Sequence, residues 1–344
     1  MKDFNLLYPV RVLENFDLSA MNTFRMKARC ARFVEYDSVD ELLSIDFDAL
    51  PKPVFHIGGG SNILLTGDFP GTVLHSCIEF IKYVDMGFDE VPVMVGSGVV
   101  FDHFVSETCR HGLWGAENLS LIPGEVGAAA VQNIGAYGAE AADIISGVVC
   151  YDTLTRNKRK FSVQECRYGY RDSFFKSPEN KGRYIVTSVL FRLTRKYSPR
   201  LGYKGVQEAL GGKSPSSPQE VREAVIGIRM EKLPAPEEIG SAGSFFKNPV
   251  VQASVFKAIS PDGSAPHYDL PGGLVKIPAA WLIDQCGLRG LGIGGAAVYE
   301  SQPLVIVNAS GEATPGDVIA LEEKVISTVR ERFGISLSPE VEHV

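Results

Sequence analysis

Residues 240–249, GSAGSFFKNP, set one hydroxyl side chain, Ser244, at a bend hinged by glycine and alanine. Two phenylalanines follow, and Lys247 and Asn248 then supply a cation and an amide. The pattern is typical of neither a plain strand nor a helix. A serine at such a bend is by default a turn residue. The alternative is a hydroxyl that the bend presents to a bound molecule.

Two glycine-rich stretches offer bare backbone to a ligand. The first, GGGSN at residues 58–62, follows a predicted strand, and its N–H groups can converge on an anion. It is either a phosphate nest between two strands or a glycine-rich hairpin, and alone the hairpin is the commoner structure. The second, residues 117–138, contains four glycines and the amides Gln132 and Asn133. So bare a backbone is costly in a core and suits a flat, extended ligand, which favours the nest.

The sequence motifs give little support for a metal site, a P-loop or a Rossmann dinucleotide site. The sequence has no HExxH, no P-loop and no Cys/His cluster with zinc spacing, so we expect no metal. Gly292, Gly294 and Ala297 fit GxGxxA by letter. A dinucleotide fingerprint must follow a strand and open a helix, whereas here a helix-like segment precedes it and a strand-like segment follows. The sequence therefore argues against a Rossmann site.

Composition limits the class of protein. The 344 residues suffice for two or three domains, and 45% hydrophobic with 22% charged residues is ordinary for a globular chain. The net charge of −7 argues against nucleic acid as main partner. Six scattered cysteines without a CxxC pair indicate reduced thiols in the cytosol. The N-terminus lacks a secretory signal, and no apolar run is long enough to span a membrane.

The elements that must position these loops alternate between strands and helices in the first half. Strands are predicted on both sides of GGGSN, at 91–98 and at 184–193, with a helix from about residue 100. In that helix Val100, Phe104 and Cys109 share a face, and Gly112 ends it. Residues 197–220 are rich in Gly, Pro and Ser and read as a loop near a domain boundary.

Two later helices carry explicit start signals. Ser217 is the predicted cap of the first, with Pro218 as its first residue and Glu220 as the reciprocal capping partner. Thr314, Pro315 and Asp317 repeat this pattern before a helix that Gly334 ends. Its predicted apolar stripe comprises Val318, Leu321, Val325, Val329 and Phe333.

Seven segments, in order and over nearly the whole chain, resemble the UDP-N-acetylenolpyruvoylglucosamine reductase (MurB) family. They are IGGGSNILL, GAENLSLIPGEVGAAAVQNIGAYGAE, YGYRDSFFK, GSAGSFFKNP, AAWLIDQCGLRG, GGAAV and LSPEVEHV. Tyr203 and the wording GYRDS resemble the type I subgroup, whose extra loop bears a tyrosine. The surroundings of Tyr203, LGYKGV, depart from the YGDL pattern of that loop.

The resemblance implies an α+β fold, with a vanillyl-alcohol-oxidase (PCMH)-type FAD-binding region and a smaller α/β substrate-binding domain. FAD is non-covalent in the family, and His56 is then a strand histidine packing near the cofactor rather than a covalent link. The residues implied to hold FAD are Gly58, Gly59, Gly60, Ser61, Asn62, Gly124, Gly127, Gln132, Asn133, Ile134 and Gly135.

The family reaction has two halves. NADPH gives a hydride to flavin N5, and the flavin then gives a hydride to C3 of the enolpyruvyl ether of UDP-N-acetylglucosamine, yielding UDP-N-acetylmuramate for peptidoglycan. Arg171 and Glu340 are implied to flank the substrate carboxylate, and Ser244 to protonate C2. An arginine suits a carboxylate because of its paired donors, and a protonated glutamate can donate to a developing enolate. Without the resemblance, Arg171 reads as a surface ion pair and Glu340 as a solvated chain end.

Substrate binding is implied for Tyr203, Lys232, Asn248 and Gln302. The first three would meet the nucleotide diphosphate or sugar, and Lys232 also suits the C-terminus of its helix. We expect a cytoplasmic monomer without nucleic-acid or membrane partners. The expected domains are 1–195 for FAD with 326–344 returning to it, a tyrosine-bearing linker at 196–216 and a substrate domain at 217–325. The alternatives are an FAD oxidase of the same fold that uses oxygen, and a flavin- or nucleotide-binding protein without turnover.

Overall fold

The computed structural model describes residues 10–84, 87–235 and 237–344. The first nine residues, where the absence of a secretory signal was expected, lie outside this range. The chain groups into two compact units. Unit 1 comprises residues 1–16, 30–59 and 69–231, and unit 2 comprises residues 17–29, 60–68 and 232–344. Within the described ranges, none of the helices has the length and apolar character needed to cross a bilayer.

Unit 1 contains a four-stranded sheet in the order β1-β2-β5-β3. β2 and β3 both run parallel to β5, whose register sets Glu35 opposite His75 and His56 opposite Leu74. A short helix, α1, follows β2, and the side chain of Ser38 caps it by accepting from Glu41 N. The elements are β1 (Arg11–Asp17), β2 (Arg29–Tyr36), α1 (Val39–Ser44), β3 (Val54–Ile57) and β5 (Phe69–Ser76).

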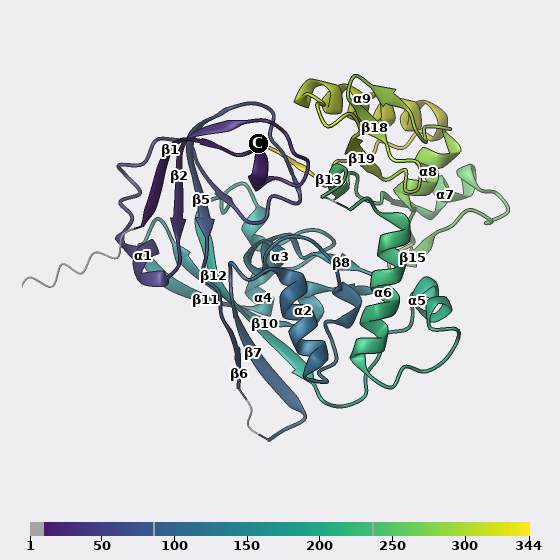
Figure 1. The fold of residues 1–344 in the computed structure, drawn as a ribbon. Coiled ribbons are helices and arrows are strands. Elements are labelled where there is room, and N and C mark those ends of the chain that lie inside the picture. Colours follow the sequence, from purple (N-terminus) through teal and green to yellow (C-terminus); the bar gives the residue numbers. More distant parts are fainter. Residues whose placement is uncertain (1–9, 85–86, 236) are drawn as a thin grey trace, which may run out of the picture. The chain divides into compact units, whose positions relative to one another are not determined.

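An antiparallel sheet in the order β11-β10-β12-β7-β6 forms the other part of unit 1. Helices α2 and α3 pack against it, as Figure 1 shows. Its strands are β6 (Ile81–Tyr83), β7 (Glu90–Gly96), β10 (Ile145–Asp152), β11 (Asn157–Ser162) and β12 (Tyr184–Thr194), with the hairpin β8 (Gly135–Ala136) and β9 (Ala139–Glu140) beside it. The helices are α2 (Phe101–Arg110), α3 (Val126–Gln132) and α4 (Val163–Cys166), with 3-10 turns η2 (Glu117–Leu119), η3 (Ala141–Asp143) and η4 (Phe174–Lys176).

Three apolar clusters hold unit 1 together. The largest lies between the five-stranded sheet and α2 and α3. A second joins the two sheets, where Val34 and Leu74 of one meet Tyr151 and Ile185 of the other. The third packs Trp114 against Val225 and neighbouring residues of α6 (Pro218–Lys232). Burial of these side chains removes apolar surface from water, which is the main favourable term in folding.

Helix α6 is fixed to α2 by a paired ion contact. Arg222 donates from both terminal nitrogens to the two oxygens of Asp102, at 2.5 and 2.8 Å. At its start, Ser217 Oγ accepts from Glu220 N at 3.3 Å, as predicted. The reciprocal half of the capping box was wrong, because the Glu220 carboxylate accepts from Ser216 N and Oγ instead.

Unit 2 is built on a sheet in the order β13-β19-β18-β17 and a smaller one in the order β14-β16-β15. A two-stranded parallel pair of β4 and β20 completes it. The strands are β4 (Ile63–Leu64), β13 (Gly240–Ser244), β14 (Val250–Gln252), β15 (Tyr268–Leu270), β16 (Leu274–Lys276), β17 (Gly292–Ile293), β18 (Ala296–Val298), β19 (Val305–Asn308) and β20 (Glu342–His343). The helices are η1 (Ser19–Met21), α7 (Ala253–Ile259), α8 (Ala279–Gln285) and α9 (Pro315–Phe333).

Helix α9 confirms its predicted boundaries. Thr314 and Asp317 form a complete capping box, and Gly334 closes the helix at φ +69°. Four residues of the predicted stripe are buried, and Phe333 is half-buried. Gly292, Gly294 and Ala297 lie in and around the β17–β18 hairpin rather than at a strand-to-helix turn, so the structure confirms that they are no Rossmann fingerprint.

Several local predictions were wrong. Val100 is 54% exposed and precedes α2, which begins at Phe101, because the sheet and α3 cover only the face that carries Phe104 and Cys109. Residues 204–209 form helix α5 (Lys204–Ala209) inside the expected loop, with buried Val206 packing into the Trp114 cluster. Residues 240–244 form strand β13, although an irregular one.

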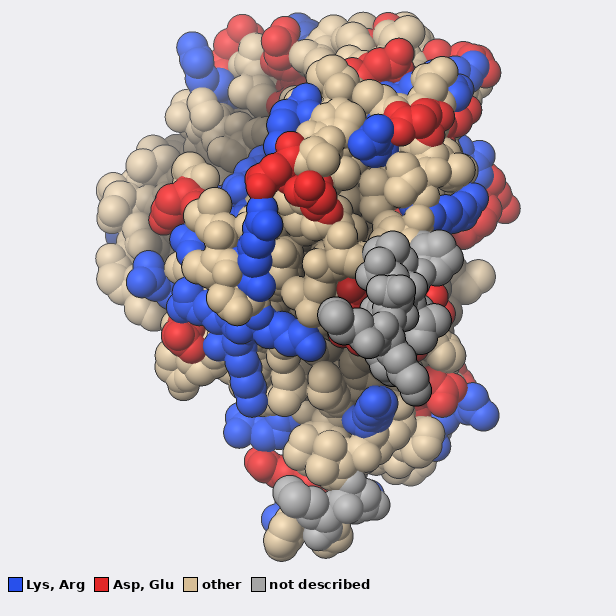
Figure 2. All heavy atoms as spheres, turned by 90° about the vertical axis from the view of Figure 1, so that its left-hand side faces the viewer, with Lys and Arg blue, Asp and Glu red and all other residues tan. Residues whose placement is uncertain are grey.

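All six cysteines are free, as expected. Figure 2 shows acidic and basic side chains interspersed over one face, with one denser group of basic side chains. Charges of opposite sign also pair on the N-terminal sheet, where Arg32 Nε lies 2.7 Å from Glu14 Oε1. Such exposed pairs contribute little to stability.

The strand that ends in Ser244 contains a bulge. Ser241 pairs with Val307 of β19, but the next paired residue is Ser244, opposite Val305. Gly243 lies in this irregularity with φ +68°. A bulge bends its strand and re-aims the side chains near it.

Gly243→Ala should therefore destabilise the protein through backbone conformation alone. A Cβ at Gly243 would meet no atom within 4 Å, so only the left-handed φ is unfavourable, which costs about 1 kcal/mol or more. Urea unfolding should show a lower midpoint for this variant and a smaller loss for Gly243→Asn. The control is Gly67→Ala, which has the same open space without the positive φ. Equal midpoints for Gly243→Ala and Gly67→Ala would contradict this account.

Candidate active site

The first two glycines of GGGSN lie against the second glycine-rich stretch in unit 1. A Cβ on Gly59 would lie 3.0 Å from the Cα of Gly124, and one on Gly58 would lie 3.0 Å from Ala128 Cβ. The hairpin alternative for GGGSN is wrong, because β3 pairs with β5 whereas β4 pairs with β20. The structure thus brings together the backbones of the two stretches that sequence reasoning assigned to one ligand.

Part of the second stretch belongs to the core, although its bare backbone was expected to be a costly choice for one. Residues 126–132 form α3, whose Ala129 and Ala130 are buried in the large core. Gly127 packs on Ser97, the residue after β7, since a Cβ there would lie 2.9 Å from Ser97 Cβ. Small residues in this stretch therefore allow α3 to pack closely. They also leave the backbone bare around Gly124, which has φ +107°.

After α3 the chain turns at Asn133, whose side chain holds the turn together. Asn133 is fully buried in the left-handed region, with φ +48°. Its Nδ2 donates to Gly169 O at 2.8 Å and to Glu140 Oε2 at 3.0 Å, and its Oδ1 accepts from Ala142 N. Gln132, Ile134 and Gly135 are half-buried around it. The Asn133 side chain is therefore committed to the protein.

Arg171 lies beside this turn. Its Nη2 donates to Gly135 O, and its Nη1 lies 3.5 Å from Asn133 O. Arg171 has φ +54°, an unfavourable backbone conformation for a residue with a side chain. The guanidinium contacts these main-chain carbonyls and the Tyr170 ring. Arg171 thus sets its charge against the second glycine-rich stretch.

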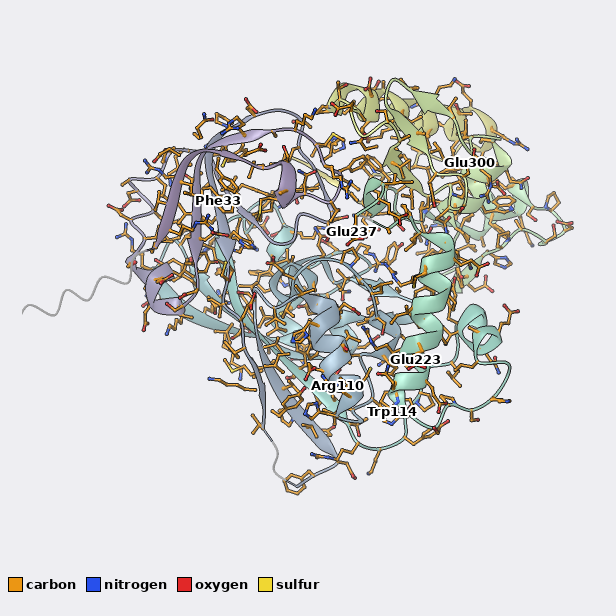
Figure 3. The ribbon with its side chains drawn as sticks, viewed as in Figure 1. Phe33, Arg110, Trp114, Glu223, Glu237 and Glu300 are labelled. Carbon is orange, nitrogen blue, oxygen red and sulfur yellow. The ribbon has the colours of Figure 1, made fainter. Side chains whose placement is uncertain are left out.

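Tyr203, from the predicted tyrosine-bearing linker, packs against the second glycine-rich stretch. Its ring meets that of Tyr137 edge-to-face, with centroids 5.3 Å apart. Both tyrosines pack on the cluster that contains Trp114, labelled in Figure 3. The tyrosine-bearing loop is therefore seated within unit 1 even though its sequence departs from the family pattern.

Sequence reasoning missed two residues around Tyr137. Asn118 Nδ2 donates to Tyr137 O at 2.8 Å and to Arg200 O at 2.9 Å, which fixes that turn. Arg229 of α6 lies near the Tyr137 hydroxyl, and burial lowers the pKa of its guanidinium. No described residue accepts from the buried Arg229 Nε. The only sequence signal was its position three residues before Lys232.

In unit 2, Ser244 is exposed, and the two phenylalanines after it are buried. Phe245 is 0% and Phe246 is 2% exposed, and Phe245 meets Phe24 edge-to-face. Ser244 thus lies between the bulge at Gly243 and this apolar support. Ser244 is consequently held on a rigid strand end rather than on a free loop.

Glu340 lies directly beside the segment that follows Ser244. Its N–H donates to Phe245 O at 2.8 Å, and Phe246 forms a β-bridge with Pro339. Asn62, the last residue of GGGSN, donates to Glu340 O at 3.1 Å. The structure therefore brings Asn62, Glu340 and the Ser244 segment together in unit 2, and the half-buried Glu340 is not a solvated chain end.

The remaining glycine-loop residues begin the second segment of unit 2, residues 60–68. Gly60 has φ +58°, and a Cβ there would lie 1.9 Å from Met21 O, so only glycine fits. Ser61 is half-buried.

The other residues assigned to the substrate lie in unit 2. Asn248 Oδ1 accepts from Ala279 N at 2.9 Å and so supports the start of α8. Lys232 ends α6 and is exposed, and Gln302 is half-buried in the turn before β19.

His56 lies on β3 beside the first glycine run. Its Nε2 is 2.6 Å from the Tyr36 hydroxyl, and burial lowers the pKa of the imidazole to about 4. His56 is therefore neutral and engaged by a protein partner at physiological pH, in line with a packing role.

Comparison with known proteins extends these observations. The sequence model for the UDP-N-acetylenolpyruvoylglucosamine reductase C-terminal domain matches residues 235–344, and that for an FAD binding domain matches residues 32–155. The UDP-N-acetylenolpyruvoylglucosamine reductase of Bacteroides fragilis (strain YCH46) is 45% identical over 333 residues, which are 96% of this chain and 99% of the relative. That of Porphyromonas gingivalis is 42% identical over 97% of this chain and 99% of the relative.

A solved structure is also similar. The crystal structure of the Thermus caldophilus MurB reductase covers 97% of this chain and 98% of its own, with a TM-score of 0.67 and 26% identity. With its PCMH-type FAD-binding domain and its specific C-terminal domain, the chain belongs to the UDP-N-acetylenolpyruvoylglucosamine reductase (MurB) family.

Proposed function

We propose that this protein is the flavoenzyme UDP-N-acetylmuramate dehydrogenase, which reduces the enolpyruvyl group of UDP-N-acetylglucosamine-enolpyruvate with NADPH during peptidoglycan precursor synthesis. The observation that carries the proposal is similarity at 42–45% identity over nearly the full length of both chains. The match includes the C-terminal domain that bears Ser244 and Glu340. Neither alternative, an oxidase or a binding protein without turnover, accounts for that domain.

The residues present fit a non-covalent FAD. At Gly58 and Gly59 a Cβ would lie only 3.0 Å from Ala128 Cβ and Gly124 Cα, so the main chain stays bare there, and such bare backbone suits a pyrophosphate. When bound, FAD supplies the hydride relay between NADPH and the substrate. We assign its binding to the glycine run, Ser61 and Asn62, and to the stretch from Gly124 to Gly135. Asn133 supports this stretch, since its side chain holds the turn together.

Arg171 is proposed to bind the substrate carboxylate. Main-chain carbonyls hold its Nη1 and Nη2 beside Asn133 and Gly135. This fixed guanidinium pre-organises a charge that a carboxylate can meet through paired donors. The unfavourable φ of Arg171 supports a functional reason for its placement, because strain of this kind gathers at active sites.

Ser244 is proposed to give the proton. Hydride addition at C3 leaves an electron pair at C2, and the Ser244 O–H bond breaks as its proton forms the C2–H bond. The exposed hydroxyl on a supported strand end is compatible with this transfer. Glu340, held one strand away, is proposed to act as a neutral acid toward the enolate.

Substrate binding by Tyr203, Lys232, Asn248 and Gln302 remains a proposal. Tyr203 is supported by its packing on Tyr137, and Asn248 by a hydrogen bond that fixes its amide. The expected domains are defined by what they bind and also stay proposals. The last boundary between the compact units lies between Glu231 and Lys232, and residues 17–29 and 60–68 also belong to unit 2. Cytoplasmic location is supported by six free thiols, and a monomeric state stays a prediction.

The activity can be tested by anaerobic addition of NADPH, followed by the enolpyruvyl substrate, while flavin absorbance is recorded. We expect bleaching by NADPH and recovery of the colour only with that substrate. Recovery with oxygen at full rate, but not with the enolpyruvyl compound, would instead establish the oxidase.

Arg171→Lys should lose most turnover although the charge is kept. Lysine is a point charge and cannot offer the planar pair of donors. The matched control is Arg167→Lys, because Arg167 also has a positive φ, at +44°, in the same unit. Steady-state assays should show a large loss for Arg171→Lys and near-normal turnover for the control. Near-normal turnover of both variants would remove Arg171 from the carboxylate.

Ser244→Ala should separate the two half-reactions. Flavin reduction by NADPH should stay within a few-fold of wild type, because it needs no proton at C2. Reoxidation by the substrate should slow about 10²–10⁴-fold, the typical contribution of a positioned proton donor. FAD content should persist, since the change is small and the side chain is exposed.

Stopped-flow absorbance measures both steps, and Ser244→Cys is the control that keeps an exchangeable proton. If the alanine variant reoxidises as fast as wild type, Ser244 is only a turn residue.

A further inference from the structure

A group of side chains outside the proposed active-site residues lies on one face of the four-stranded sheet. β2 and β5 run parallel, and their register sets Glu35 directly opposite His75. Cys77 lies two residues beyond His75, just after β5, so its side chain points to the same face. Each of the three residues is half-buried, with side-chain exposures of 18% for Glu35 and 14% for His75.

The spacing of the three nearest atoms suits a metal ion. His75 Nδ1 lies 3.3 Å from Glu35 Oε1 and 3.6 Å from Cys77 Sγ, and Sγ lies 3.9 Å from Oε1. Tetrahedral Zn²⁺ with bonds of about 2.0–2.3 Å separates nitrogen and oxygen by about 3.3 Å, and sulfur from either by about 3.6 Å. The observed triangle is therefore close to one face of a zinc tetrahedron.

Neighbouring groups orient two of these side chains. His75 Nε2 lies 2.9 Å from Glu125 Oε1, and a proton on Nε2 leaves the Nδ1 lone pair directed at the cluster. Arg11 Nη1 lies 2.6 Å from Glu35 Oε2, which holds the other carboxylate oxygen, Oε1, toward His75. The Phe33 ring, labelled in Figure 3, stacks on His75 with centroids 6.2 Å apart. A carboxylate on the second nitrogen of a ligating histidine is the usual support of a zinc site.

The charges of the cluster also favour a dication. Burial acts to lower the pKa of His75, but Glu125 and Glu35 outweigh it and raise that pKa. Burial and the same two carboxylates raise the pKa of the Cys77 thiol to about 11. The two glutamates thus place negative charge around the cluster, which a dication can balance.

We propose that Glu35 Oε1, His75 Nδ1 and Cys77 Sγ bind one thiophilic divalent cation of the Zn²⁺ class, with water at the fourth position. The mixed nitrogen, sulfur and oxygen set selects against Mg²⁺ and Ca²⁺, which prefer oxygen ligands. The ion joins β2 to β5 within unit 1. The expectation of no metal rested on linear motifs, and these ligands come from two strands about forty residues apart in sequence.

The test uses untagged, FAD-loaded protein freed of metal by a chelator and dialysed. Zn²⁺ is titrated in competition with a chromophoric chelator, and Co²⁺ is added separately as a spectroscopic probe. We expect one Zn²⁺ per chain and a higher thermal unfolding midpoint with Zn²⁺, because the ion binds the folded state. With Co²⁺ we expect tetrahedral d–d bands at wavelengths beyond flavin absorption and a thiolate charge-transfer band.

Cys77→Ala is the decisive variant, because it removes one ligand atom and little volume. Its Zn²⁺ affinity should fall by more than about 10-fold, the lower range for loss of even a supporting residue. The matched control is Cys286→Ala, which removes the other half-exposed thiol and should bind as wild type. Circular dichroism and FAD content confirm folding of both. Wild-type protein that fails to compete with the chelator, or equal binding by Cys77→Ala, would overturn the proposal.

Discussion

The close approach of two bare main chains, at Gly59 and Gly124, is the constraint on which unit 1 depends. The first belongs to the turn after β3, and the second to the turn before α3. A single Cβ at Gly59 would lie 3.0 Å from Gly124 Cα, and backbone cannot yield as a flexible side chain can. The parallel sheet positions the turn that contains Gly59. The packing of α3 on the antiparallel sheet positions the turn that contains Gly124. The cores of both sheets must therefore form for the two turns to meet.

In unit 2, hydrogen bonds rather than bare glycine backbone hold distant segments of the chain together. The chain end runs beside residues 245–247 and then pairs with β4, so that the segments before and after Glu340 are both tied to strands. Asn62 contacts Glu340 O and Glu342 N, one through its side chain and one through its main chain. The same GGGSN sequence thus serves both units, with its first two glycines in unit 1 and the rest in unit 2. This division explains why the run is not a hairpin.

Local signals predicted those parts of the fold that depend on local energies. The capping box of Thr314 and Asp317 and the closing Gly334 were read correctly, because cap and turn geometry is decided within a few residues. Predictions failed where a distant element decides. Val100 matched the helical pattern but faces away from the sheet that buries Phe104. The glycine- and alanine-rich stretch became α3 because the antiparallel sheet offered it a surface, which a count of bare residues does not reveal.

The candidate site was found mainly through motif order, and the structure explains what such motifs leave out. Arg171 has a left-handed backbone conformation that no sequence pattern predicted. The side-chain oxygen of Asn248, a proposed substrate-binding residue, accepts a hydrogen bond from the start of α8. A motif contains residues that are close in sequence. Neighbouring parallel strands are joined by long crossover connections, so they bring together residues that are far apart in sequence. Glu35 and His75 are neighbours only through the β2–β5 register. Chemistry assembled across parallel strands is therefore the class that linear reading misses, even in a chain whose family is evident from its sequence.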